Sequence, residues 1–159
     1  MRKIILIRHA TAEPERYPLK DFDRNLDGTG MAEAARLGKY LLAKKEVPDA
    51  IHYSSSNRTS QTAEILIREA KLDAVVTVPE MDLYNAGYLR LIEQIKYFGA
   101  DQYSILMIAH NPGISQIATA LSQDSYQLSP GSAVCLNFAF DSWSEIRSGS
   151  GKENWYFIP

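Results

Sequence analysis

The chain has 159 residues, of which 45% are hydrophobic and 23% charged, and its formal net charge is −2 at pH 7. A chain of this length fits one domain with a sizeable core and needs no disulfide or metal to hold it together. The near-neutral charge argues against broad electrostatic attraction to nucleic acid or to an anionic membrane surface, so neither is expected as a partner.

The cysteine content and the amino terminus bear on the compartment. Cys135 is the single cysteine, so no internal disulfide can form. It lies in an apolar run and is expected to be a small core residue, with a reactive thiol as the open alternative. No leader-like segment precedes the first strand, and no stretch of about 20 apolar residues occurs. We therefore expect a soluble cytoplasmic protein.

The first half of the chain alternates between strand and helix patterns. Ile4 to Ile7 form a continuous apolar run, which is typical of a strand buried on both faces. A polar, proline-bearing stretch without a regular pattern follows from Thr11 to Asp27. Apolar residues at helical spacing then predict a helix over Gly30 to Lys45, and a short strand is expected over Ala50 to Tyr53. The next helix has its buried face marked by Ala63, Leu66, Ile67 and Ala70.

The second half continues this alternation. β-Branched residues predict a strand over Ala74 to Val78, and Ser104 to Ala109 repeats the first pattern, an apolar strand ending in a histidine. Late strands are expected over Ala133 to Phe140 and Trp155 to Ile158. The remaining helices are marked by Leu89, Ile92, Ile95 and Phe98, and by Ile114, Ile117, Ala118 and Leu121. The order predicts a single α/β domain over residues 1–159, with a mainly parallel sheet flanked by helices and room for an antiparallel edge.

Four basic side chains occupy comparable positions in this order. Arg8 and His9 follow the first strand, Arg58 opens the helix after the second, and His110 follows the fourth. Since ligands of open α/β sheets bind beyond the carboxyl ends of the strands, we expect these groups to meet at one edge. Two guanidiniums and a helix amino terminus can hold a tetrahedral oxyanion, and phosphate is the obvious one. One histidine would attack phosphorus and the other stabilise the equatorial oxygens, while the arginines should lower the imidazole pKa.

Four motifs, in matching order, resemble the histidine phosphatase (phosphoglycerate-mutase-like) superfamily. They are Leu6 to Ala10, Arg24 to Gly30, Ser54 to Ala63, and Ile108 to Pro112. The short chain and the His110-Asn111-Pro112 sequence resemble the small SixA-type phosphohistidine phosphatase branch. Ala10 departs from the pattern, since the larger superfamily usually has glycine there.

The resemblance implies a three-layer, phosphoglycerate-mutase-like domain and a phosphatase that needs neither metal nor cofactor. His9 would be the nucleophile, phosphorylated during turnover, with Arg8, Arg58 and His110 completing the phosphate pocket. The expected substrate is phosphohistidine on a protein partner, in signal transduction. A small-molecule phosphomonoesterase and a non-catalytic phosphate-binding module stay open as alternatives, and the oligomeric state is unknown.

Glu80 lies where many members of the superfamily carry the proton donor. Asp82 is a competing candidate, and a surface charge beside a helix is the alternative for Glu80. A phosphorylated imidazole departs readily once its ring is protonated, whereas an alkoxide needs a supplied proton. A weak or absent acid would therefore favour phosphoramidates and aryl esters over alkyl phosphates.

Other polar and aromatic residues have simpler interpretations. A zinc site built from the two histidines and Glu80 is disfavoured, because Arg8 and Arg58 would repel the cation. His52 lies inside a short strand and is expected to be structural or exposed. Ala10 to Arg24 is the one long irregular segment near the site, so we expect an open, shallow pocket that admits a phosphohistidine on another protein. The serines Ser54, Ser55 and Ser56 are expected to cap a helix and to support the phosphate loop. The aromatic residues Tyr84, Tyr88, Trp143 and Trp155 are assigned to the core, and a partner-facing role is left open for them.

Overall fold

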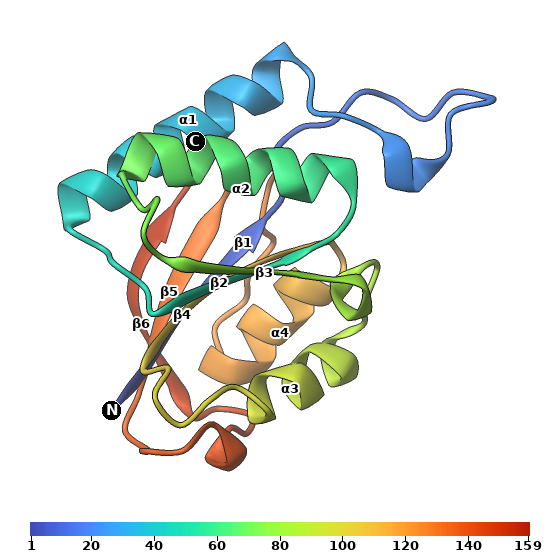
Figure 1. Ribbon diagram of the computed structural model, residues 1–159. Helices are drawn as coiled ribbons and strands as arrows, with labels where there is room; N and C mark the ends of the chain where they lie inside the picture. The colour runs from blue at the N-terminus through green and yellow to red at the C-terminus, as the bar shows by residue number, and fades with distance from the viewer.

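The computed structural model describes residues 1–159 and has one six-stranded sheet in the order β3-β2-β4-β1-β5-β6 (Figure 1). The four strands from β3 to β1 run parallel, and β5 and β6 pair antiparallel beside β1. The predicted mainly parallel sheet with an antiparallel edge is therefore confirmed. The strands are β1 Arg2–Arg8, β2 Ala50–Ser54, β3 Val76–Glu80, β4 Ser104–Ala109, β5 Ala133–Phe138 and β6 Gly151–Phe157.

Helices cover both faces of this sheet. In Figure 1, α1 (Gly28–Lys44) and α2 (Asn57–Ala70) lie above it, and α3 (Tyr88–Lys96) and α4 (Gly113–Ser122) lie below it. Three short 3-10 helices, Asp21–Asp23, Met81–Leu83 and Trp143–Glu145, lie in connections between these elements. The protein thus has the predicted three-layer α/β architecture.

β1 is the central strand of the core. Its apolar side chains alternate between two clusters: Ile4 and Leu6 pack toward α3 and α4, while Ile5 and Ile7 pack toward α1 and α2. All four side chains are fully buried. Because both faces of the strand are covered, its sequence is a continuous apolar run rather than an alternating one. Cys135 is buried in the second of these clusters, as expected.

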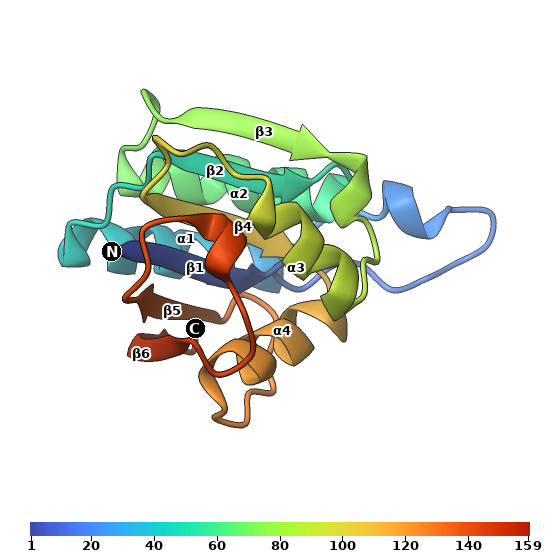
Figure 2. The same cartoon turned by 90° about the horizontal axis from the view of Figure 1, so that it is seen from below.

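The two edge strands, β3 and β6, begin at other residues than predicted (Figure 2), and β5 ends at Phe138 rather than Phe140. β3 runs two residues later than predicted and contains Pro79, because an edge strand tolerates a residue without a backbone N–H. β6 begins at Gly151 rather than Trp155, since its first residues are exposed and leave no apolar pattern. No helix in this structure is both long and apolar enough for a membrane crossing.

The parallel strands bring distant residues to a common edge. Arg8 at the end of β1 is in register with Ala109 at the end of β4, so His9 and His110 follow their strands side by side. The segment between β1 and α1 extends beyond this edge (Figure 1). The fold therefore gathers the two histidines beneath a long connecting segment.

Candidate active site

A pocket of about 430 Å³ lies at this edge of the sheet. It contains Arg8, His9, Arg58 and His110, so the structure brings together the four basic groups predicted from the sequence. Glu80 does not line it. The other lining residues are Thr11, Ala12, Glu15, Asp21, Arg24, Asn85, Asn111 and Pro130.

His9 is held as a neutral ring with one nitrogen free of hydrogen. Its Nδ1–H donates to the carbonyl oxygen of Ala10 at 2.8 Å, which leaves the lone pair on Nε2. Arg58 Nε donates to that Nε2 at 3.3 Å. Burial, together with the charges of Arg58, Arg8 and Arg24, lowers the pKa of His9 to about 4, although the Ala10 hydrogen bond opposes this. A neutral imidazole with a free Nε2 is the form that a nucleophile requires.

Arg58 links the two histidines. It is 2% exposed, in the first turn of α2. While its Nε reaches His9, its Nη2 donates to His110 Nδ1 at 3.2 Å, and the two imidazole centroids are 5.1 Å apart. One guanidinium thus fixes the spacing and orientation of both rings.

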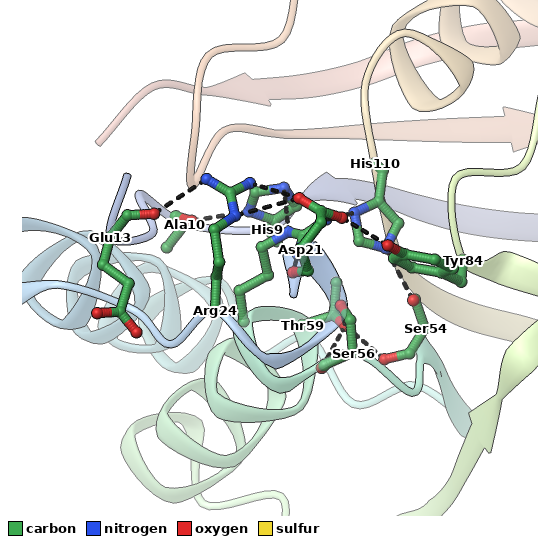
Figure 3. Close-up of polar contacts among 11 residues, drawn as sticks. His9, Ala10, Glu13, Asp21, Arg24, Ser54, Ser56, Thr59, Tyr84 and His110 are labelled. Carbon is green, nitrogen blue, oxygen red and sulfur yellow. Dashed lines mark hydrogen bonds and ion pairs between the residues drawn. The ribbon is translucent and has the colours of Figure 1, made fainter. Parts of the chain in front are cut away.

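His110 is oriented in the opposite tautomer. Because Nδ1 accepts from Arg58, the proton is on Nε2, which donates to Ser54 Oγ at 2.8 Å (Figure 3). Burial, with the nearby His9 and Arg58, lowers the pKa of His110 to about 3. Ser54 therefore orients a site histidine from the end of β2. Ser56 occupies the cap position of α2, but its side chain makes no capping hydrogen bond.

Arg8 supplies a second guanidinium to the pocket. Its Nη1 donates to the carbonyl oxygen of Leu128 at 3.0 Å, and its buried Nε has no hydrogen-bond partner. Burial lowers the pKa of Arg8, while Glu33 opposes that shift. A buried donor without a partner is uncommon in proteins, so Arg8 retains hydrogen-bonding capacity for an anion.

Residues 4–92 match the sequence profile of the Histidine phosphatase superfamily (branch 1). The chain belongs to the histidine phosphatase superfamily. The matched residues include Arg8, His9 and Arg58, and they end before His110.

Relatives and solved structures agree with this assignment. An uncharacterized chloroplastic protein of Arabidopsis thaliana is 30% identical over 165 residues, which cover 97% of this chain and 74% of the relative. A candidate phosphohistidine phosphatase SixA from Nakamurella multipartitia has the same fold, with a TM-score of 0.86 at 20% identity over 99% of this chain and 96% of the other. The structure of the protein histidine phosphatase SixA complexed with tungstate has a TM-score of 0.77 at 19% identity. The comparison covers 97% of this chain and 95% of the other. The phosphoglycerate-mutase-like fold predicted from the sequence is confirmed.

The carboxylates suggested as proton donors by the superfamily pattern lie outside the pocket. Glu80 Oε1 is 2.5 Å from His52 Nδ1, and the His52 ring packs on Phe98 with centroids 4.3 Å apart. Asp82 is exposed and forms an ion pair with Arg90 at 2.8 Å. The role of Glu80 as proton donor stays a prediction, without support from its position.

Sequence reasoning gave no site role to several polar residues at or beside the pocket, among them Asp21, Arg24 and Tyr84. Asp21 and Arg24 come from the irregular segment before α1 and line the pocket. Tyr84, which was assigned to the core, packs edge-on against His110 with centroids 5.5 Å apart. Arg24 was visible in a family-like motif, but nothing in the sequence singled out Asp21 or Tyr84.

The donor set does not suit a metal ion. No group of three or more histidine, cysteine or acidic side chains is arranged to hold one. The two pocket histidines instead share the guanidinium of Arg58, whose positive charge lies between them. The chemistry of the pocket is that of an anion site.

Proposed function

We propose that this protein is a phosphatase that works through a phosphohistidine intermediate on His9, and that its substrate is phosphohistidine on a protein partner. The observation that carries the proposal is the unprotonated Nε2 of His9, which belongs to a neutral ring in an arginine-lined pocket and accepts a hydrogen bond from Arg58. Membership in the histidine phosphatase superfamily supports the same chemistry.

The reaction has two transfers at phosphorus. His9 Nε2 attacks the phosphoryl group, a bond to His9 forms, and the bond to the departing imidazole nitrogen of the substrate breaks. Water then attacks phospho-His9, which releases inorganic phosphate and regenerates the neutral ring. Arg8 and Arg58 donate to the phosphoryl oxygens, and their preset orientation stabilises the charge that develops on them. His110 joins them when the bound phosphoryl group favours a proton on its Nδ1, since its Nε2–H already donates to Ser54.

The pocket favours leaving groups that need no dedicated acid. Glu80 is bonded to His52 outside the pocket, and Asp21 has a pKa of about 2, so it is ionised at neutral pH. An imidazole that is protonated in solution departs without help from such a group. A phosphoramidate is therefore the substrate class that the side chains present suit best.

A neighbouring cavity supports a protein rather than a small molecule as the carrier. It measures about 870 Å³, lies between α3 and α4, and shares Asn111 with the catalytic pocket. Leu89 lines it and is 64% exposed, and Ile92 and Pro112 are also part of its wall. Because the two cavities adjoin, a protein segment seated here would place its phosphohistidine within reach of His9.

Phosphate release separates this function from its alternatives. Purified wild-type protein and His9→Asn are incubated, without added metal, with a phosphohistidine-bearing protein domain and separately with simple phosphate esters. We expect release from the protein substrate and an acid-labile, base-stable phosphoenzyme that the variant lacks. Release from small esters alone would assign a phosphomonoesterase, and phosphate binding without turnover would assign a binding module. Cytoplasmic location and a signalling role are further parts of the proposal that identification of the partner would test.

A further inference from the structure

Asp21 places a carboxylate among the arginines of the pocket (Figure 3). Its Oδ2 lies 3.0 Å from Arg58 Nη2 and its Oδ1 lies 3.0 Å from Arg24 Nη2. The hydroxyl of Tyr84 donates to Oδ2 at 2.6 Å. An anion thus already occupies donors of two of the three pocket arginines.

Arg58 has little hydrogen-bonding capacity left. Its Nε donates to His9, and its Nη2 donates to both His110 and the Asp21 carboxylate. Its Nη1 donates to the backbone carbonyl of Asp21 at 2.6 Å. Four of the five N–H groups of a guanidinium are therefore in use, so a phosphoryl group that takes more than the one remaining N–H of Arg58 must share or replace an existing bond, and the bonds to Asp21 are among them.

The Asp21 carboxylate is charged, and the turn that carries it lies outside the hydrophobic core. Burial raises its pKa, but hydrogen bonds from Tyr84 and Arg58 and the charges of Arg58 and Arg24 lower it to about 2. The short 3-10 helix that carries it, Asp21–Asp23, contains no buried residue. Displacing this turn would not open the hydrophobic core.

We propose that Asp21 is a specificity-determining residue, whose carboxylate competes with the substrate's phosphoryl group for Arg58 and Arg24. The competition weakens the binding of small free phosphates. A phosphoryl group that is carried by a protein is also held by contacts between the two proteins, which offset this weaker binding. Inorganic phosphate, the product, is released for the same reason. This inference rests on the proposed function and names how the same site rejects small competitors.

Calorimetric titration with inorganic phosphate, and separately with tungstate, tests the competition without requiring turnover. Asp21→Asn removes the charge but keeps an oxygen that accepts hydrogen bonds, and we expect it to bind both anions about tenfold or more tightly than wild type. Asp21→Glu keeps the charge and should bind them within about threefold of wild type. Asp23→Asn is the matched control, because Asp23 lies on the same turn, is exposed and does not line the pocket; it should change binding less than twofold.

Unchanged or weaker anion binding by Asp21→Asn would overturn the inference and make Asp21 a residue that only positions Arg58. Turnover of p-nitrophenyl phosphate and of a phosphohistidine-bearing protein domain gives the second readout. We expect Asp21→Asn to lower KM for the small ester more than for the protein substrate. If wild type turns over both substrates and the variant keeps the same ratio of kcat/KM values, the inference fails and the proposed function stands. If neither wild type nor any variant turns over either substrate, the proposed function fails. The titrations with phosphate and tungstate still decide the role of Asp21.

Discussion

His9 and His110 are held in opposite tautomers by different partners, and the pocket depends on both being neutral. The carbonyl of Ala10 fixes the proton of His9 on Nδ1, and Ser54 fixes that of His110 on Nε2. Arg58 faces the remaining nitrogen of each ring. The charged imidazoles are disfavoured mainly because both rings are buried, and in addition because a proton on either of these nitrogens would meet the guanidinium.

The neutral histidines make folding stability depend on pH. The pKa values of His9 and His110 fall from about 6.5 to about 4 and about 3 on folding, so between pH 6.5 and 4 the unfolded chain binds more protons. Their stabilising contribution is therefore present above pH 6.5 and lost as the pH falls through that window. Urea unfolding at pH 7 and pH 5 should show a loss of about 1–2 kcal/mol for each histidine. Between pH 7 and pH 5, His9→Asn should lose less unfolding free energy than wild type. An identical loss would contradict the lowered pKa of His9.

Ser54 gives a second prediction at the scale of one side chain. Ser54→Ala leaves the buried Nε2–H of His110 without an acceptor, which costs about 1–3 kcal/mol. We expect lower stability in urea and a reduced kcat, since His110 is no longer oriented. Ser55→Ala is the control, because the Ser55 side chain makes no hydrogen bond and only its backbone N–H contacts Glu80. Equal effects of the two substitutions would argue against a role for Ser54 in the site.

Glu80 can be tested by a conservative substitution. Glu80→Gln keeps a hydrogen-bond acceptor near His52 and removes the acid. Since Glu80 lies outside the pocket, we expect kcat for a phosphoramidate to stay within about threefold of wild type. A loss of about a hundredfold or more would restore Glu80 as the proton donor.

The residues recovered from the sequence and those missed differ in their local context. Arg8, His9 and His110 directly follow buried apolar strands, so short-range patterns place them at the carboxyl edge. Asp21 lies in a stretch with no pattern, and its partners Arg58 and Tyr84 are 37 and 63 residues away along the chain. Such contacts depend on tertiary packing, which no local pattern of residues reports.

At the scale of whole elements, the first turn of α1 packs closely against the segment that follows His9. The N–H of Gly30 donates to Asp27 Oδ1 at 2.8 Å, which caps the helix. A Cβ atom on Gly30 would lie 1.9 Å from the carbonyl oxygen of Thr11, two residues after His9. The helix can approach this segment so closely only because residue 30 has no side chain.

Two glycines in the first turn of α1 form a matched pair for a test. Gly30→Ala must displace Thr11, so we expect about 1–3 kcal/mol of destabilisation in urea and a fall in kcat. A Cβ atom on Gly28 meets nothing within 4 Å, so Gly28→Ala should be neutral or stabilise the helix by up to about 1 kcal/mol. Equal stability of the two variants would show that the approach of α1 to Thr11 does not matter.

The starts of β2, β4 and β5, in the interior of the sheet, were predicted correctly, and those of the edge strands were not. β1 and β4 are buried on both faces, and their apolar runs are unambiguous. Most of β3 and the first half of β6 are exposed, so their side chains carry no burial pattern. The sequence identified the existence of these edge strands but not where they begin.

At the scale of the molecule, a substitution in the cavity between α3 and α4 tests whether a protein substrate docks there. Leu89→Glu places a charge on its exposed wall without touching the catalytic pocket. We expect kcat/KM for a phosphohistidine-bearing protein domain to fall about tenfold, while that for p-nitrophenyl phosphate stays within twofold. Tyr97→Glu is the control, because Tyr97 is 86% exposed near the end of α3 and does not line the cavity. If kcat/KM falls equally for both substrates, or for neither, this surface is excluded as the contact for the partner.

The central position of β1 also sets an order of events during synthesis. This strand precedes both of its hydrogen-bonding partners along the chain, since β4 begins at Ser104 and β5 begins at Ala133. Pairing across so long a separation is entropically costly and slow. Since β1 is made before both of its partners, His9 acquires its surroundings only once β5 has been made, and a nascent chain released before β5 carries His9 without a complete pocket.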